Sequence, residues 1–298
     1  MIKTLTETEI GRIAADAVTE IARRAVNGAP LYSYVDSCPL TWSAVEEGGW
    51  DFIGASEAHG GGDATMRDLV EVGKAWGSAC IPLPLMESIW AKRWSLAARA
   101  LGGPVSLSVP RVRQGDKSSL APFGALADVG IARSIGRDDS FDRGPVGLAD
   151  PFAPSLCASI LPYSTDIPDE AAYELAVIWA AEAVGAAQTL VDLSVQYAKD
   201  REQFGQPIGS FQAIKHRLAD MHSDAEYAET AVIWASAERD QAERATRYAI
   251  DTSIRIAESA IQVHGGMGFT WELGLHFYLR AMLTQRDLLC GLWAGVRS

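Results

Sequence analysis

The chain has 298 residues, enough for about two domains at roughly 150 residues each. Hydrophobic residues make up 48% and charged residues 21%, which excludes a disordered chain. The formal net charge is −12, which argues against nucleic-acid binding because nucleic-acid-binding domains are usually basic. The four cysteines form no CxxC pair and no Cys/His cluster, which argues against a zinc site or a disulfide scaffold.

The amino-terminal segment indicates where the protein resides. Residues 1–18 lack the basic and apolar regions of a signal peptide. No apolar run approaches the ~18 residues that a membrane-spanning helix needs. We therefore expect a cytoplasmic protein that does not enter a membrane.

The first hundred residues show helical patterns. Thr6 and Glu9 fit a capping box at the start of a first helix. Its apolar stripe recurs at helical spacing. The stripe consists of Ile10, Ile13, Ala14, Ala17, Val18, Ile21 and Ala22. Further helices are predicted over residues 40–47, 64–76 and 85–101.

The composition changes at residues 102–104, which read Gly-Gly-Pro. From there to residue 168, short segments are broken by Gly, Pro, Ser and Asp. Four of them have strand character. They are residues 105–109, 127–132, 146–148 and 156–161. The sequence therefore predicts a small β domain.

The last part of the chain is strongly helical. One helix is predicted over residues 169–200, and its wide apolar stripe indicates a central, buried position. Three more are predicted over 211–235, 250–261 and 275–292, with the spacing of an antiparallel bundle. The expected fold is mainly α with a small β domain. Its predicted domains are a helical domain (1–101), a reduced β domain (102–168) and a four-helix bundle (169–298).

Two segments of the predicted bundle have residues suited to ligand binding. Arg201 is placed at a helix end, where its guanidinium could bind a phosphate or carboxylate, or could cap its own helix. Gly265, Gly266 and Gly268 would let a backbone approach a diphosphate closely. The same glycines also fit a helix end followed by a tight turn.

Taken together, these segments resemble a known family. The string REQFGQPIGSFQ (201–212), followed by QVHGGMGF (262–269), resembles the carboxyl-terminal bundle of the acyl-CoA dehydrogenase family. The glycine loop at 54–62 and the helix and proline turn at 72–85 are also similar to that family. The resemblance implies a helical domain, a β-barrel-like domain and a four-helix bundle. It also implies FAD as cofactor and α,β-desaturation of an acyl-CoA thioester.

The resemblance also implies a set of flavin contacts. Matching positions would bind the FAD diphosphate and adenine of a neighbouring subunit. They are Arg201, Gln203, Phe204, Gln262, Gly265, Gly266 and Gly268.

The catalytic base of the family has no clear equivalent. Most members carry a glutamate nine residues after an arginine; counting from Arg280, that position is Leu289, or Cys290 with a one-residue slip. A smaller subclass carries the glutamate twenty-six residues before the arginine that Arg201 matches. That position is Leu175, and its neighbour Glu174 lies about 100° around the helix. Glu174 is therefore a candidate base, or a solvated glutamate that suits the helix dipole.

The predicted β domain departs from the family as well. It is short, and no tryptophan occurs between Trp94 and Trp179, where the family has a segment that flanks the flavin. This combination resembles the small, non-catalytic subunits of heterotetrameric acyl-CoA dehydrogenases from actinobacterial sterol degradation. That resemblance implies an α2β2 assembly, a bulky steroid-type acyl-CoA and a partner chain that supplies the base. An electron acceptor such as an electron-transfer flavoprotein is implied too.

Two other hypotheses remain open at this point. The chain could be a self-sufficient homo-oligomeric dehydrogenase that uses Glu174 as its base. It could instead be a scaffold subunit with the same fold and no flavin. The flavin-contact residues argue against the scaffold, and the missing base argues against self-sufficiency.

Overall fold

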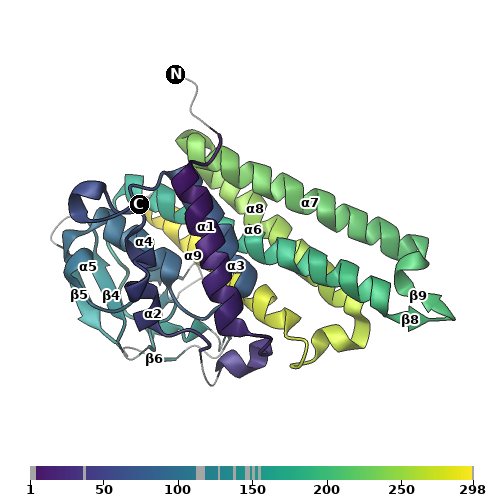
Figure 1. The fold of residues 1–298 in the computed structure, drawn as a ribbon. Coiled ribbons are helices and arrows are strands. Elements are labelled where there is room, and N and C mark those ends of the chain that lie inside the picture. The colour runs from purple at the N-terminus through teal and green to yellow at the C-terminus, as the bar shows by residue number, and fades with distance from the viewer. Residues whose placement is uncertain are drawn as a thin grey trace.

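The computed structural model describes residues 5–35, 38–111, 118–126, 128–136, 139–144, 148–149, 152–153 and 156–296. A long helical bundle forms one side of the molecule, and short helices and strands gather around one of its ends (Figure 1). The expected class, mainly α with a few strands, is confirmed. The domain boundaries remain a prediction, because one cluster of buried side chains continues from the first helices into the bundle.

Among the described residues up to 101, the amino-terminal part contains five α-helices. They are α1 (Glu9–Val26), α2 (Trp42–Glu47), α3 (Met66–Ala79), α4 (Leu85–Trp94) and α5 (Leu96–Ala100). The single helix expected over 85–101 is thus wrong. Ser95 has extended backbone angles there, and its hydroxyl accepts a hydrogen bond from the Ala98 N–H, which starts a new helix.

The start and the buried face of α1 also differ from the prediction. Thr8 rather than Thr6 caps the helix, with its hydroxyl accepting from Gly11 N–H at 3.4 Å. Ile10 and Ile13 are 47% and 54% exposed. The buried face consists of Gly11, Ala14, Val18 and Ala22. A Cβ at Gly11 would collide with the Asp68 carboxylate, so a small residue is needed where α1 meets α3.

In the described part of residues 105–161, the strands form two small sheets. The first has the order β1 (Val105–Leu107), β4 (Gly130–Ser134), β5 (Ser140–Arg143), with β1 parallel to β4. The second has the order β2 (Val109–Pro110), β3 (Ser119–Ala121), β7 (Ser159–Leu161), β6 (Leu148–Ala149), all antiparallel. The strand expected over 105–109 is thus divided between the sheets. Residues 127, 146 and 147 of two other expected strands lie outside the described residues.

Four long helices form the bundle, as expected. They are α6 (Asp169–Asp200), α7 (Gln212–Ala237), α8 (Ala242–His264) and α9 (Leu275–Val296). In the part of the chain that the structure describes, α6 alone is long and apolar enough to cross a membrane. The sequence expectation that no segment approaches this length was therefore too strict. Neighbouring elements bury 83% of its most apolar window.

The helices α3 and α6 meet at their backbones. A Cβ at Gly77 would collide with the carbonyl of Glu182, and one at Gly185 would collide with the carbonyl of Lys74. Such close approach is possible only with glycine at both positions. It places Glu182 of α6 beside the end of α3.

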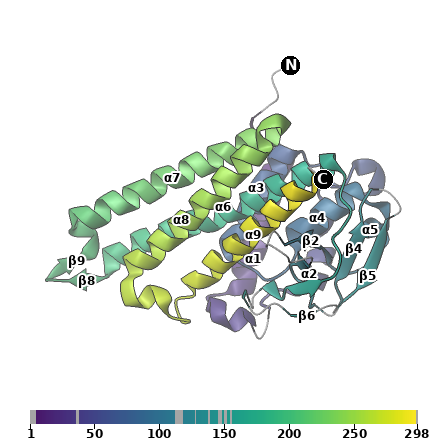
Figure 2. The ribbon, with the colours of Figure 1, turned by 180° about the vertical axis from the view of Figure 1, so that it is seen from behind.

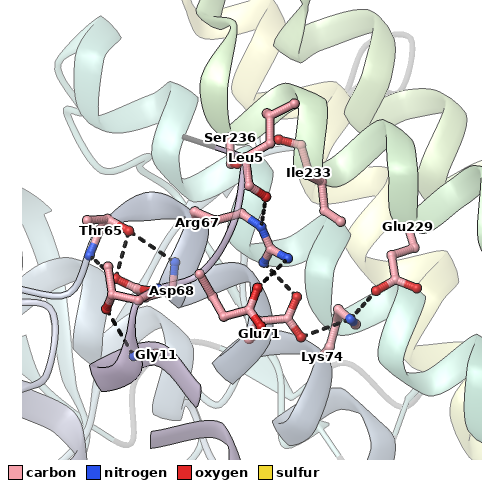
Figure 3. A network of polar contacts seen from close by, with 12 residues as sticks. Leu5, Gly11, Thr65, Arg67, Asp68, Glu71, Lys74, Glu229, Ile233 and Ser236 are labelled. Atoms are coloured by element: carbon pink, nitrogen blue, oxygen red, sulfur yellow. Dashed lines mark hydrogen bonds and ion pairs between the residues drawn. The ribbon is translucent and has the colours of Figure 1, made fainter. Parts of the chain in front are cut away.

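A polar network joins α3 to α7 (Figure 3). Lys74 binds Glu71 at 2.9 Å and also forms an ion pair with Glu229 of α7. Arg67 binds Glu71 at 2.6 Å and donates to the Leu5 carbonyl at 2.9 Å. The network therefore attaches both α7 and the segment before α1 to α3.

Candidate functional site

The connection from α6 to α7 is a tight hairpin. Its strands are β8 (Glu202–Gln203) and β9 (Gln206–Pro207). The two turn residues, Phe204 and Gly205, both have positive φ, 55° and 80°. Hairpins of this type need left-handed backbone at both positions. The turn projects the Phe204 ring into solvent, where it is 92% exposed and contacts Phe211 edge-on at 6.1 Å.

Arg201 lies at the end of α6, directly before this hairpin. Its backbone N–H donates to Tyr197 at 2.9 Å. Its guanidinium is exposed and has no hydrogen bond or ion pair with any described residue, so no capping of its own helix is seen. The neighbouring Gln203 side chain donates to the Glu202 carbonyl at 2.7 Å. The guanidinium is thus available to a ligand or to a second chain.

The glycine turn follows α8 as a 3-10 helix, Gly265–Phe269. Gly265 has φ 60° and ψ −136°, a conformation that essentially only glycine adopts. A Cβ at Gly265 or Gly266 would meet nothing within 4 Å, so this backbone is open to an approaching group. A Cβ at Gly268 would collide with the Ile261 carbonyl. Gly268 is therefore required by the turn itself.

The hairpin and the glycine turn lie at the same end of the bundle (Figure 2). Tyr197 stacks on His264 with ring centroids 4.3 Å apart, and its hydroxyl donates to the His264 carbonyl at 3.4 Å. Burial lowers the pKa of His264. Gln262 is exposed one turn earlier on α8. We call this end the distal site. It consists of Arg201, Gln203, Phe204, Gln262, Gly265, Gly266 and Gly268.

Glu174 lies at the other end of α6 and is largely buried. One of its oxygens, Oε2, accepts from Arg93 Nε at 2.9 Å and from Trp94 Nε1 at 2.7 Å. Arg93 also donates to the carbonyls of Gly54 and Ala64, each at 2.9 Å. Glu174 thus connects α6 to α4 and to the glycine loop. A catalytic role for Glu174 remains a prediction.

The usual base position lies on α9 against the second sheet. Leu289 is buried, and Cys290 Sγ accepts a hydrogen bond from Arg247 at 3.5 Å. A Cβ at Gly291 would collide with the Pro110 carbonyl, so α9 packs directly on β2. A groove of about 590 Å³ runs beside this contact. Among the described residues that line the groove, Asp287 is the one carboxylate, and it is exposed.

Sequence reasoning missed one buried glutamate, Glu87, and one half-buried glutamate, Glu182. Glu87 of α4 and Glu182 of α6 both line a partly open pocket of about 60 Å³. Glu87 accepts from Trp179 Nε1 at 3.1 Å, and Glu182 accepts from Gln285 Nε2 at 3.2 Å. The available signal was an isolated glutamate in each of two otherwise apolar segments, PLMESIWA and IWAAEAVGA. Only the fold shows that the two segments face one another.

This chain is similar in sequence to known proteins. The family described as acyl-CoA dehydrogenase, C-terminal domain, matches residues 176–287. The acyl-CoA dehydrogenase IpdE2 of Mycolicibacterium smegmatis is 30% identical over 301 residues, covering 96% of this chain and 93% of the relative. IpdE2 of Mycobacterium tuberculosis is 33% identical over 248 residues, covering 78% of this chain and 76% of the relative.

Solved structures show the same fold at low identity. A variant of the Tcur3481-Tcur3483 steroid ACAD has a TM-score of 0.75 at 16% identity, covering 97% of this chain and 96% of that one. The ChsE4-ChsE5 complex from Mycobacterium tuberculosis has a TM-score of 0.71 at 19% identity, covering 99% of this chain and 97% of that one. The FAD complex of PigA has a TM-score of 0.71 at 16% identity, covering 99% of this chain and 100% of that one. The similarity to IpdE2 over nearly the whole length shows that this chain belongs to the acyl-CoA dehydrogenase family.

Proposed function

We propose that this chain is one subunit of an FAD-dependent acyl-CoA dehydrogenase that desaturates an acyl-CoA thioester between Cα and Cβ. It works with an unlike partner chain and offers that partner the distal site as half of a flavin-binding site. One observation carries the proposal. The distal site is exposed except at Gly265 and Gly268, and the Arg201 guanidinium is unpaired within the described chain, while Leu289 and Cys290 occupy the base position without a carboxylate.

The residues of the distal site fit the flavin cofactor. A guanidinium gives forked hydrogen bonds to phosphate, so Arg201 suits the diphosphate. The exposed Phe204 ring suits stacking on adenine. The open backbone at Gly265 and Gly266 lets a diphosphate approach the chain closely. FAD, when bound, accepts the hydride of the reaction; this chain would hold and orient it.

The base would come from the partner. The candidate base on this chain, Glu174, already accepts two hydrogen bonds at one oxygen from Arg93 and Trp94. An α2β2 assembly with an unlike subunit is consistent with the two-component names of the similar ChsE4-ChsE5 and Tcur3481-Tcur3483 structures. The name steroid ACAD supports a bulky, steroid-type acyl group. An electron-transfer flavoprotein would reoxidise the flavin, and we place the complex in the cytoplasm.

The proposal is tested by flavin content. The chain is purified alone and after co-expression with a second acyl-CoA dehydrogenase subunit, and bound flavin is measured by visible absorbance together with the mass in solution. We expect a colourless chain alone and a yellow heteromer. Arg201→Ala should lower the flavin content of the heteromer, whereas Arg244→Ala, an exposed arginine near the start of α8, should not.

Two outcomes would overturn the proposal. Stoichiometric flavin in a homo-oligomer of this chain alone would favour the self-sufficient dehydrogenase with Glu174 as its base. A heteromer whose flavin content is the same with Arg201→Ala would remove the half-site assignment. A heteromer that never contains flavin would favour the scaffold.

A further inference from the structure

Tyr197 connects the two segments of the distal site. It lies in the last turns of α6, and its carbonyl accepts the Arg201 backbone N–H at 2.9 Å. Its ring stacks on His264, with ring centroids 4.3 Å apart and an angle of 30° between the rings. Its hydroxyl donates to the His264 carbonyl at 3.4 Å. One side chain thus contacts both the ring and the backbone of the residue that precedes the glycine turn.

The His264 ring is held in place by its own helix. His264 is only 4% exposed, and its Nδ1 lies 2.8 Å from the Ala260 carbonyl oxygen. A carbonyl oxygen can only accept a hydrogen bond, so Nδ1 carries the hydrogen and donates it. Burial lowers the pKa of His264, which keeps the ring uncharged at neutral pH. The ring therefore presents a fixed, neutral face to Tyr197.

The glycine turn is attached to α6 through this stack. A Cβ at Gly265 or Gly266 would meet nothing within 4 Å, so the start of the turn has open space around it. Gly268 folds the turn back onto α8, where a Cβ would collide with the Ile261 carbonyl. Among the described residues, no other side-chain hydrogen bond or ring contact joins α6 to residues 264–269. At this end of the bundle, the stack therefore sets where the turn lies relative to α6.

The Arg201 side of the distal site is fixed to the same helix end. The Ile208 N–H donates to the Arg201 carbonyl at 2.8 Å. A Cβ at Gly209 would lie 2.9 Å from the Ala198 carbonyl oxygen, so the chain returns closely over α6 after the hairpin. Residues four positions apart lie on the same side of a helix, which places Tyr197 next to the start of the hairpin. A shift of Tyr197 against His264 would therefore shift Arg201 against the glycine turn.

We propose that Tyr197 and His264, the positioning pair, hold Arg201 and the open backbone of Gly265 and Gly266 at the separation at which both contact one diphosphate. This inference rests on the proposed function of the distal site and adds two residues that act through others. The two halves of the pair are 67 positions apart in the chain. Groups that are fixed before a ligand arrives bind it more tightly, because less freedom is lost on binding.

A purely structural role for the stack predicts a different pattern. If the stack only stabilised the bundle, its loss would affect flavin binding independently of Arg201. If the stack positions Arg201, its effect on flavin binding requires the guanidinium to be present. Variants of residues that act through one another have non-additive effects, so a double variant separates the two cases.

Flavin release from the heteromer measures the effect. After dilution, the released flavin is separated from the protein by filtration and measured by its absorbance. Tyr197→Leu removes the stack, and we expect flavin release to be about tenfold faster. His264→Leu removes the stack from the other side and should match it. Tyr197→Phe keeps the ring and loses only the hydrogen bond of 3.4 Å, so its release rate should stay within about threefold of the unmodified heteromer.

Tyr173 provides a matched control on the same helix. It is also half-buried, and its hydroxyl donates to the Ala235 carbonyl of α7 at 2.6 Å, near the opposite end of α6. Tyr173→Leu should lower the free energy of unfolding without changing flavin release.

Two further measurements test how the positioning pair acts. In an Arg201→Ala background, Tyr197→Leu should change the release rate by less than about twofold, because the guanidinium that it positions is gone. On the chain alone, the backbone N–H groups of residues 262–270 should exchange with deuterium about fivefold faster in Tyr197→Leu. Tyr197→Phe and Tyr173→Leu should leave that exchange unchanged. The exchange measurement needs no flavin.

The contrary results are distinguishable from one another. If Arg201→Ala speeds flavin release and Tyr197→Leu does not, the positioning pair is refuted and the proposed half-site remains. An equal effect of Tyr197→Leu with and without Arg201, or an equal effect of Tyr173→Leu, would show a purely structural role. Unchanged exchange in residues 262–270 would show that the stack does not order the turn. If Arg201→Ala leaves flavin release unchanged, the half-site assignment fails and the positioning role fails with it.

Discussion

Replacing Glu174 separates a structural role from a catalytic one. Both donors that reach this carboxyl, Arg93 Nε and Trp94 Nε1, bind the same oxygen, at 2.9 and 2.7 Å. Glu174→Gln can keep an amide oxygen at that place and so preserve both hydrogen bonds while losing the charge. Glu174→Ala removes the acceptor altogether. The pair of variants therefore distinguishes the hydrogen bonds from the charge.

The expected cost follows from these contacts. In Glu174→Ala the guanidinium of Arg93 keeps the Gly54 and Ala64 carbonyls, but the Trp94 N–H loses its acceptor. Hydrogen bonds to charged groups contribute about 1.5–3 kcal/mol each, and breaking a buried ion pair costs about 3–5 kcal/mol, so we expect a loss of about 3 kcal/mol. For Glu174→Gln, which retains both hydrogen bonds, we expect a loss of about 1 kcal/mol.

Urea unfolding of the chain gives these free energies directly, and turnover of the heteromer is measured in parallel. If Glu174 only holds α6 against α4, Glu174→Ala should clearly lower the free energy of unfolding and Glu174→Gln should keep near-normal turnover. The reasoning is refuted if Glu174→Gln abolishes turnover by several orders of magnitude while both variants keep the stability of the unmodified chain. That result would identify Glu174 as the base.

Three further predictions concern stability. Because the pKa of Glu182 is raised in the native state, its stabilising effect is present below the usual glutamate pKa of 4.5 and is lost as pH rises through the native pKa. Urea unfolding from pH 5 to 8 should therefore show a flatter profile of unfolding free energy against pH for Glu182→Gln, with a slope smaller by at most about 1.4 kcal/mol per pH unit. Gly185→Ala should cost about 2–4 kcal/mol because its Cβ meets the Lys74 carbonyl, whereas Gly266→Ala, with open space around it, should unfold like the unmodified chain. Lys74→Met removes the ion pair with Glu229 and should lower the free energy of unfolding by about 1–2 kcal/mol. An unchanged midpoint of urea unfolding would show that the polar network between α3 and α7 does not stabilise the fold.

The helices of the bundle were predictable because their signals are local. The bounds expected for α6 match the structure, since Pro168 precedes the helix and its apolar period continues to Asp200. The face of α1 was not predictable in this way. Ile10 and Ile13 are more apolar than Gly11, yet Gly11 is buried because its small size lets α1 approach Asp68 of α3. Hydropathy ranks residues for burial, but the shape of the neighbour selects the face.

The distal site was predictable from short sequence segments, whereas the surroundings of Glu174 and Glu87 were not. The residues of the distal site occur in two short segments that resemble those of the acyl-CoA dehydrogenase family, and this resemblance is what grouped them. The partners of Glu174 lie 80 and 81 positions away on α4, and Trp179 reaches Glu87 across 92 positions. No periodicity connects such distant residues. Only the packing of α4 against α6 shows which glutamate is engaged and which pair shares a pocket.

The conformation of the hairpin turn supports a contact from outside the chain. Phe204 is a non-glycine residue at positive φ, and such a position costs about 1 kcal/mol or more. Its ring is 92% exposed, so burial within the described chain offsets little of that cost. The adjacent Arg201 guanidinium gains no intramolecular partner either. Strained and exposed groups are stabilised when a ligand or a partner subunit covers them, and this is the role that we propose for a shared flavin.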